Sequence, residues 1–294
     1  MPFTLSHPAA VLPFLRDGRS RGPWVASALV AGSIAPDVPY FADSLVRGTF
    51  RYGLATHAVW GVPTVDVAIA AALAAGWHGL LREPLVALLP PRWADAADRL
   101  TAPAGRPPDA RAAAWFALSA AAGAATHVGW DAFTHGGRLG ERLLPVLGST
   151  VHGTPLYSLL QYGFSAVALG VLACYVPHTL RCAARETAPH TEVRDTLVAG
   201  PGSGVPRGAA ERARRIRLSR RARAGVGAVV AAAAVAGAAQ RLAWSGLGPL
   251  SRARLTDLVP PVAFGGGAGT AAALACYAAA VRLRAARPQS PQAG

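Results

Sequence analysis

LYSLLQYGFSAVALGVLACYVP, the segment at residues 156–177, runs for 22 residues without a charged side chain. A helix needs about 20 apolar residues to cross the hydrocarbon core of a bilayer, and the buried helices of soluble domains seldom reach that length. The segment therefore predicts a membrane-spanning helix.

Five further apolar stretches extend this prediction to the rest of the chain. We interpret the protein as an all-α, polytopic transmembrane helical bundle with about six spans. The first stretch is the weakest, because Pro36 and Asp37 interrupt its end. A shorter apolar segment at residues 3–15 cannot span a bilayer and is expected to form a short interfacial or re-entrant helix. The six stretches lie at residues 24–41, 58–81, 112–130, 156–177, 225–244 and 258–281.

The composition agrees with a membrane protein that carries its charge in the loops. Of the 294 residues, 52% are hydrophobic and only 15% are charged, whereas a soluble domain has about 25% charged residues. The net charge is +14 and the mean hydropathy is nevertheless +0.30, so basic and apolar residues must be segregated. The three cysteines indicate no disulfide framework and are expected to be small apolar filler residues.

Arginine placement predicts the orientation. Arginines are dense before the first stretch, between the second and third, between the fourth and fifth, and after the sixth, and they are sparse in the other loops. Because cytoplasmic loops carry an excess of basic residues, all the arginine-rich segments of a six-span protein fall on the cytoplasmic side. We therefore expect a multi-pass protein of the cell membrane with cytoplasmic N- and C-termini.

The arginine-rich segment at residues 181–224 divides the chain into three parts. We expect a membrane domain with a His/Asp cluster at residues 1–180, a basic cytoplasmic linker and helix at 181–224, and a transmembrane hairpin with a short tail at 225–294. The basic run is expected to contact the lipid bilayer through anionic headgroups rather than a specific nucleic acid, and no particular protein partner is indicated. Its arginines are Arg212, Arg214, Arg215, Arg217, Arg220, Arg221 and Arg223.

Four ionisable residues are predicted to meet at the extracytoplasmic boundary. Asp37 ends the first span, His57 begins the second, and His127 and Asp131 end the third. Ionisable groups at membrane depth are costly, so a compensating interaction is expected. Two imidazoles and two carboxylates suit a divalent metal ion such as zinc, manganese or iron, which with open positions would activate water for hydrolysis. The alternatives are a proton-linked site and polar residues that only fix helix packing.

His127, Asp131 and His135 lie on one face of a helix because they are spaced four residues apart. A rise of 1.5 Å per residue separates the two histidines by about 12 Å, too far for one ion. His135 is therefore expected to bind a second ion, to contact a substrate, or to support a residue that binds the metal, unless the helix breaks before Gly136. A threonine precedes each of three histidines and is expected in the same supporting role, namely Thr56, Thr126 and Thr134.

Asp66 is a separate intramembrane polar residue, inside the second stretch. On a continuous helix it would lie about 13 Å along the axis from His57 and on the opposite face. An intramembrane carboxylate is a functional candidate. We favour a packing role, in which a protonated Asp66 contacts a hydroxyl such as that of Ser119.

These motifs resemble the bacterial membrane family known as domain of unknown function 4184. The resemblance covers residues 1–176 and rests on four features: MPFTLSHPAA at the start, GSIAPD at residues 32–37, Thr56-His57 with Asp66, and the HxxxDxxTH pattern at residues 127–135. It implies a bacterial inner-membrane location and assigns no activity.

The order of the motifs is also similar to that of the LexA-binding inner-membrane family of proposed metal-dependent hydrolases. That resemblance implies metal ligation by His7, Asp37, His57, His127 and Asp131. The Asp-x-Asp-His pattern of that family is reduced here to Asp37-Val38-Pro39. His7 reaches the outer site only if segment 3–15 enters the membrane part way.

Three functions follow from these patterns. The leading one is a metal-dependent hydrolase at the membrane interface, acting on a lipid-linked or phosphoester substrate. The second is a non-catalytic membrane scaffold or stress-associated partner-binding protein. The third is a proton- or metal-linked transporter, which would depend most on Asp66. The sequence has no Gly-rich phosphate loop, GxSxG elbow or HExxH motif, so common hydrolase and NTPase signatures are missing.

Overall fold

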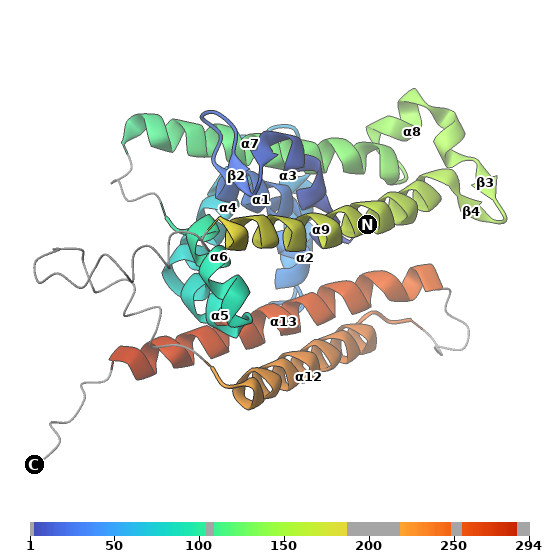
Figure 1. Cartoon of the computed structure of the whole chain (residues 1–294). Coiled ribbons are helices and arrows are strands. Elements are labelled where there is room, and N and C mark those ends of the chain that lie inside the picture. Colours follow the sequence, from blue (N-terminus) through green and yellow to red (C-terminus); the bar gives the residue numbers. More distant parts are fainter. Residues whose placement is uncertain (1–2, 104–108, 187–217, 248–254, 287–294) are drawn as a thin grey trace, which may run out of the picture.

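A bundle of helices forms almost the whole of the computed structural model, which describes residues 3–103, 109–186, 218–247 and 255–286 (Figure 1). Short and broken elements dominate the first hundred residues. In chain order, these elements are η1 Thr4–Phe14, β1 Leu15–Arg16, β2 Arg19–Ser20, α1 Ala26–Ile34, η2 Ala35–Asp37, α2 Val38–Ala42, η3 Thr49–Tyr52, α3 Gly53–Thr56, α4 Val65–Gly76, the π-helix η4 Trp77–Leu81, α5 Arg82–Leu88 and α6 Pro91–Thr101.

Long helices make up most of the remainder. The two strand pairs, β1 with β2 and β3 with β4, are antiparallel hairpins of two residues a strand. Most of the predicted segment 181–224, including Arg212, Arg214, Arg215 and Arg217, lies outside the described residues. The later elements are α7 Ala110–Thr134, α8 Leu139–Leu143, η5 Pro145–Gly148, β3 Thr150–Val151, β4 Thr154–Pro155, α9 Leu156–Arg185, α12 Arg220–Trp244 and α13 Leu255–Ala286.

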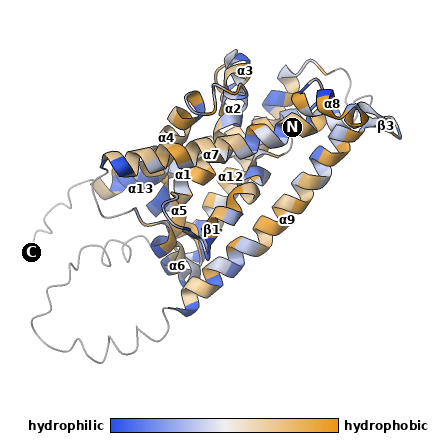
Figure 2. Ribbon diagram, turned by 90° about the horizontal axis from the view of Figure 1, so that it is seen from above, coloured by the Kyte–Doolittle hydropathy of each residue, from blue (hydrophilic) through white to orange (hydrophobic). Residues whose placement is uncertain are grey.

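Four helical segments have the length and composition to cross a membrane: Val65–Leu88, which joins α4, η4 and α5, then α9, α12, and Thr256–Ala286 within α13. The predicted class, an all-α bundle with membrane-spanning character, is confirmed. Helix α9 stands at the side of the bundle with apolar residues along most of its length (Figure 2). Its exposed large apolar side chains suit contact with lipid, and they are Leu159, Phe164, Val167, Val171 and Val176.

The first predicted span, residues 24–41, is not one continuous helix, which corrects the count of six. It consists of α1, the 3₁₀ turn η2 and α2. Pro36 has no N–H to continue the hydrogen bonding of α1, and a proline also disfavours helical geometry in the residue before it. Helix α1 has only nine residues, and Ala28, Leu29 and Ser33 on it are fully buried. It is thus a core element rather than a lipid-facing span.

The third predicted span lies within α7, which has 25 residues and is therefore about 37 Å long. That length is enough to cross a bilayer. Helix α7 is not among the four apolar segments, because polar residues such as Ser119, His127 and Asp131 make it more hydrophilic. All three of these residues are buried, so its polar face is turned into the bundle.

The N-terminal segment is folded into the bundle rather than lying on its surface. Helix η1 contacts α1, α7 and α9. Val11, Leu15 and Leu29 form a buried apolar cluster between η1 and α1. The expected short N-terminal helix is therefore present, and its packing carries His7 into the interior, where it is 4% exposed.

Two glycines allow the backbones of α1 and α7 to touch. A Cβ atom added at Gly32 would lie 2.1 Å from the carbonyl oxygen of Ala120, and one added at Gly123 would lie 2.2 Å from that of Leu29. No side chain fits at such distances, so the crossing requires glycine. The close approach brings the carbonyl of Ser33 to the ring of His127, and it therefore positions the candidate site.

Replacing Gly123 by alanine is expected to destabilise the protein, even though alanine favours helices by about 1 kcal/mol over glycine. Relief of the clash must separate α1 from α7, at a cost of about 1–3 kcal/mol beyond the propensity gain. Gly129→Ala on the same helix is the matched control, because nothing lies within 4 Å of its added Cβ. Unfolding in detergent should show a loss for Gly123→Ala and a neutral or stabilising change for Gly129→Ala. Equal effects would contradict the close crossing.

Helices α12 and α13 form an antiparallel hairpin with a similar close contact. A Cβ atom added at Gly237 would lie 2.2 Å from the carbonyl oxygen of Gly265, and one added at Gly269 would lie 2.1 Å from that of Ala233. Small residues let helix backbones approach closely in lipid. This packing is typical of membrane helix pairs.

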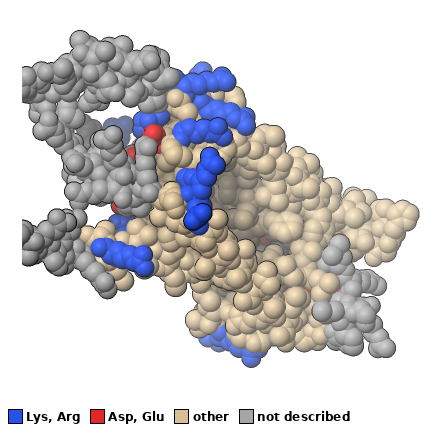
Figure 3. Space-filling view, turned by 60° about the horizontal axis from the view of Figure 1, so that its bottom comes forward, with Lys and Arg blue, Asp and Glu red and all other residues tan. Residues whose placement is uncertain are grey.

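The arginines of the arginine-rich segments make most of their contacts at one end of the structure. They join the β1–β2 hairpin, α5, α6, the last turn of α9, the start of α12 and the end of α13. Figure 3 shows most Lys and Arg atoms toward one end, beside a face with little charge. The contacting pairs are Arg19 with Glu186, Arg82 with Asp98, Arg99 with Ala183, Arg223 with Leu89 and Arg282 with Leu80.

A second, sparser group of arginines lies at the opposite end of α12. Arg241 donates to Asp43 at 2.6 Å, and the guanidinium of Arg47 lies 4.2 Å from the ring centre of Trp244. Arg223 and Arg241 are 18 residues apart on this helix, which separates their backbones by about 27 Å. Among the described residues, Arg223 and Arg241 therefore lie at opposite ends of α12.

Candidate metal centre

Four of the predicted ligands converge in the interior. Asp37 ends η2, His57 directly follows α3, and His127 and Asp131 stand one turn apart on α7. Each offers one ligand atom, and these four atoms all lie within 4.8 Å of one another. All four residues are buried. We refer to them as the His–Asp cluster.

The local breaks in the chain explain how the cluster forms. The 3₁₀ turn η2 interrupts the helix between α1 and α2, and it places Asp37 at the interior, 3.5 Å from His127 Nε2 on α7. The four-residue helix α3 places His57 beside the same spot, and Thr56 fixes it by donating to the carbonyl of Pro36 at 2.7 Å. The one-turn spacing on α7 puts His127 and Asp131 on the same helix face.

The distances within the His–Asp cluster match a four-coordinate ion. Two ligand atoms at about 2.1 Å from a tetrahedral ion lie about 3.4 Å apart. His57 Nε2 lies 3.6 Å from Asp37 Oδ1 and 3.4 Å from Asp131 Oδ2. His127 Nε2 lies 3.5 Å from Asp37 Oδ1 and 3.6 Å from Asp131 Oδ2. Four of the six tetrahedral edges therefore have the expected length, whereas charge-assisted hydrogen bonds would be near 2.7–2.9 Å.

Both imidazoles of the cluster are oriented for ligation. His57 Nδ1 lies 3.0 Å from the carbonyl oxygen of Gly53, and His127 Nδ1 lies 2.8 Å from that of Ser33. A carbonyl only accepts, so Nδ1 carries the proton in both rings. In the neutral imidazole this leaves a lone pair on Nε2, which faces the carboxylates. Metal-binding histidines are typically held in this way by a hydrogen bond from their other nitrogen.

Several of these atoms have no hydrogen-bond partner within the described residues. They include His127 Nε2 and Asp37 Oδ1 in the cluster, as well as Asp131 Oδ1 and His7 Nε2 beside it. A buried polar atom without a partner is costly. A cation at the centre would remove this cost for His127 and Asp37, so the residues present fit a metal ion.

Thr4, which the sequence did not single out, donates a hydrogen bond from its hydroxyl to Asp37 Oδ2. This bond orients the carboxylate so that Oδ1 faces the two imidazoles. Thr4→Val is expected to weaken divalent-ion affinity about 10- to 100-fold, as is usual when a supporting partner of a ligand is lost. Thr4→Ser keeps the hydroxyl and should retain most of the affinity. Isothermal titration of the metal-free proteins measures this, and equal affinities of the two variants would contradict the role.

His7 lies against the cluster, as its predicted role requires. Its ring stacks on that of His127, with centres 3.6 Å apart, and its Nε2 lies 3.7 Å from Asp131 Oδ1. Burial is the main cause that lowers the pKa of His7 to about 3. The imidazole is therefore neutral at pH 7 and retains an unprotonated nitrogen. His7 does not belong to the set of four whose ligand atoms lie within 4.8 Å.

His135 directly follows α7, which ends at Thr134, and lies one helical turn beyond Asp131. Its Nδ1 lies 3.1 Å from the carbonyl oxygen of Asp131, and its Nε2 lies 3.4 Å from the side-chain nitrogen of Gln161 on α9. Burial lowers the pKa of His135 to about 4. The hydroxyls of Thr126 and Thr134 donate to the carbonyls of Gly123 and Trp130 in their own helix, and that of Thr134 also lies 3.4 Å from His135 Nδ1.

Asp66 is placed differently from the continuous-helix expectation. Residues 58–64 form turns, and α4 begins at Val65, so Asp66 lies in the first helical turn. It is fully buried, and neither carboxylate oxygen has a hydrogen-bond partner among the described residues. The expected contact with Ser119 is absent, because that hydroxyl donates to Trp115 and accepts from the N–H of Val25.

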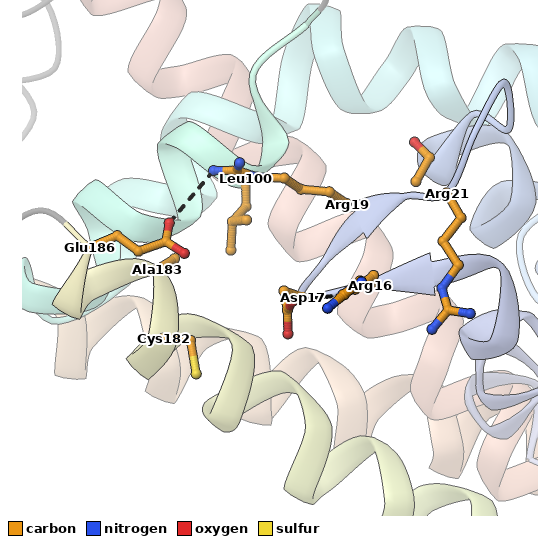
Figure 4. A pocket seen from close by; sticks show the side chains of 9 residues that line it. Arg16, Asp17, Arg19, Arg21, Leu100, Cys182, Ala183 and Glu186 are labelled. Atoms are coloured by element: carbon orange, nitrogen blue, oxygen red, sulfur yellow. Dashed lines mark ion pairs between the residues drawn. The ribbon is translucent and has the colours of Figure 1, made fainter.

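Two cavities lie apart from the His–Asp cluster. One, of about 310 Å³, is at the arginine-rich end and is lined by Arg16, Arg19 and Arg21 of the β1–β2 region, of which Arg19 reaches toward Glu186 at the end of α9 (Figure 4). The other, of about 480 Å³, is at the opposite end, beside Arg47 and Arg241. No cluster residue lines either cavity.

Comparison with known proteins gives a family but no activity. No curated protein and no solved structure matches the chain. The model of the domain of unknown function DUF4184 matches residues 1–278, and this range contains every residue of the His–Asp cluster together with His7 and His135. The chain therefore belongs to the DUF4184 family.

Proposed function

We propose that this protein is a metal-dependent hydrolase that acts at the membrane interface. The observation that carries the proposal is the arrangement of Asp37, His57, His127 and Asp131, whose facing atoms lie 3.4–3.6 Å apart. Two imidazole nitrogens and two carboxylate oxygens suit zinc, manganese or iron, whereas magnesium and calcium prefer oxygen ligands. A divalent ion in this site would act as a Lewis acid. By expanding to a fifth ligand it would take up a water molecule and activate it near neutral pH.

The chain's own residues would hold and orient this centre. The carbonyls of Gly53 and Ser33 fix the imidazole protons on Nδ1, and Thr4 fixes one oxygen of Asp37. His135 is 18% exposed in its side chain, whereas Asp131 is 4% exposed. His135 therefore lies toward the surface, where it would contact the substrate.

A lipid-linked or phosphoester substrate is supported by the apolar surroundings. The loops between α2 and α4 expose large apolar side chains, and the protein has several membrane-spanning helices. A substrate held in the bilayer would therefore reach the centre from the interface. The exposed residues of this segment are Leu45, Val46, Val59 and Trp60 in the loops and Leu54 on α3.

The uneven distribution of arginines between the two ends of the bundle supports a proposal for the location. We place the protein in the bacterial inner membrane with the arginine-rich end and both termini in the cytoplasm. At that end Arg220, Arg221 and Arg223 begin α12, where they would contact anionic lipid headgroups.

Single cysteines in a cysteine-free background test this orientation. Ser149→Cys near the β3–β4 hairpin is expected to react with a membrane-impermeant maleimide in intact cells. Arg92→Cys on α6 is expected to react only after the membrane is permeabilised. The opposite pattern would reverse the orientation, and labelling of both in intact cells would contradict a spanning topology.

The hydrolase proposal is tested on protein purified in detergent without chelator. Elemental mass spectrometry should find at least one equivalent of a transition metal, and a panel of phosphoesters and lipid phosphates should include a substrate. Hydrolysis should stop on chelation, return with the same metal, and be absent from a folded His127→Ala/Asp131→Ala variant. No metal after reloading would reject the site. Metal without hydrolysis of any panel member, but with ion uptake into vesicles that Asp66→Asn abolishes, would favour a transporter.

A further inference from the structure

The two carboxylate oxygens of Asp131 face different sets of histidines. Asp131 Oδ2 belongs to the His–Asp cluster, 3.4 Å from His57 Nε2 and 3.6 Å from His127 Nε2. Asp131 Oδ1 faces the other way, 3.7 Å from His7 Nε2 and 3.6 Å from His135 Nδ1. One side chain thus contributes an oxygen to each of two adjacent groups.

Asp131 Oδ1 and His7 Nε2 are arranged as two ligands of one metal ion would be. Both atoms are buried and lack a hydrogen-bond partner among the described residues, and the two side chains are only 4% and 2% exposed. Their separation of 3.7 Å is too long for a hydrogen bond, which is near 2.9 Å. It is close to the separation of about 3.4 Å between two ligands of one tetrahedral ion.

A single ion does not account for this pair. The cluster already supplies four ligand atoms to one ion, and His7 is not part of the set whose ligand atoms lie within 4.8 Å of one another. Two ligands of the same ion lie at most about 4.2 Å apart when each bond is about 2.1 Å. His7 therefore points to a separate position on the far side of Asp131.

We propose that the centre holds two divalent cations, the second bound by His7 and Asp131 Oδ1, with the carboxylate of Asp131 bridging the pair. This inference rests on the proposed function, since it adds a second ion to the same site. His135, whose Nδ1 contacts the backbone carbonyl of Asp131, holds the end of α7 beside the second position. Paired ions about 3.5–4 Å apart are a recurrent arrangement in phosphatases and nucleases.

The charge balance narrows the substrate to an anion. Five side chains are the proposed ligands of the two ions. Of these, Asp37 and Asp131 supply two negative charges, and His7, His57 and His127 supply none when neutral. Two divalent ions would therefore leave a surplus of two positive charges. The second ion also has few protein ligands and would keep positions open. A phosphate group supplies both the negative charge and the oxygen ligands, so a phosphoester or phosphoanhydride is the substrate class that fits this pair of ions.

Manganese binding tests the second position without any activity measurement. Metal-free protein is equilibrated with Mn²⁺, its content is measured by elemental mass spectrometry, and electron paramagnetic resonance reports whether the bound ions are magnetically coupled. The wild type is expected to bind about two equivalents and to show the exchange-coupled spectrum of a carboxylate-bridged pair. His7→Phe keeps an aromatic ring stacked on His127 and removes the nitrogen. It is expected to bind one equivalent with the spectrum of an isolated ion.

Leu5→Ala is the matched control, because Leu5 is on the same short helix and is 67% exposed. It should bind two equivalents like the wild type. If His7→Phe does not fold, His7→Gln replaces it, and the wild-type spectrum is informative by itself. One uncoupled ion in the wild type would overturn the second position while leaving the proposed hydrolase intact. No Mn²⁺ in any of the proteins would overturn the proposed function as well.

Discussion

Removal of divalent ions by a chelator is expected to lower the free energy of unfolding of the wild-type protein by about 4 kcal/mol, if the free ion was present at a thousand times its Kd. A bound ion would stabilise only the folded state, because its ligands lie on η2, on α7 and directly after α3, and these elements meet only in the folded bundle. Without the ion, the facing polar atoms of the His–Asp cluster lose their partner. Chemical unfolding in detergent, with and without chelator, measures the difference.

A variant that lacks the ligands isolates the contribution of the ion. His57→Ala/His127→Ala is expected to unfold at the same denaturant concentration with and without chelator. Thr126→Val is the matched control on α7, because its hydroxyl bonds only to the carbonyl of Gly123 in the same helix. That variant should lose stability on chelation as the wild type does.

The same experiment separates the metal centre from a structural polar network. In a non-catalytic scaffold, the histidines and carboxylates would act only through hydrogen bonds and ion pairs. Chelation would then leave the wild type unchanged, while His57→Ala/His127→Ala would lose about 3–5 kcal/mol because it leaves buried carboxylates without partners. A chelator effect confined to proteins with an intact cluster contradicts that reading.

The sequence was sufficient to predict the convergence of the cluster. Residues 24–41, 58–81 and 112–130 are read from the sequence as spans of alternating direction, and Asp37, His57, His127 and Asp131 are therefore expected at one boundary. The one-turn spacing of His127 and Asp131 fixed their shared face, because helix geometry is periodic. The proximity of these four residues needed no knowledge of side-chain packing.

Hydropathy could not predict the breaks inside the apolar stretches. Residues 24–41 and 58–81 are apolar enough to be read as helices, yet the first is divided at Pro36 and the second begins as helix only at Val65. The turn before α4 moved Asp66 into the first turn of the helix, which invalidated its calculated offset from His57. A hydropathy average reports burial, and it is insensitive to whether an apolar residue is in a turn.

The supporting contacts of the site were also beyond sequence reasoning. Two of them are backbone carbonyls, those of Gly53 and Ser33, and a carbonyl has no sequence signature. The hydroxyl of Thr4 reaches Asp37 across 33 positions in the chain. Such long-range contacts depend on how η1 and α1 pack against α7, which the pattern of apolar residues leaves open.

Arg82→Leu is expected to lower the free energy of unfolding by about 3 kcal/mol. The Arg82 side chain is 9% exposed and pairs with Asp98 at 2.8 Å. It also donates to the carbonyl oxygens of Asp98 and Thr101, which lie in the last turn of α6, where carbonyls lack helical partners. Leucine would leave these acceptors unpaired and would release α5 from α6. The loss should fall short of a fully buried pair, because Asp98 is 43% exposed.

Arg92→Leu on α6 is the control that separates this contact from loss of one positive charge at the same end. Arg92 is exposed, and its guanidinium lies 5.5 Å from the ring centre of Trp93, a contact worth about 0.5–1 kcal/mol. Chemical unfolding of both variants in detergent should give a several-fold larger loss for Arg82→Leu. Metal content should be unchanged in both, because the contact lies at the arginine-rich end, away from the His–Asp cluster. Equal losses in stability would mean that net charge, rather than the pairing of Arg82, holds α5 against α6.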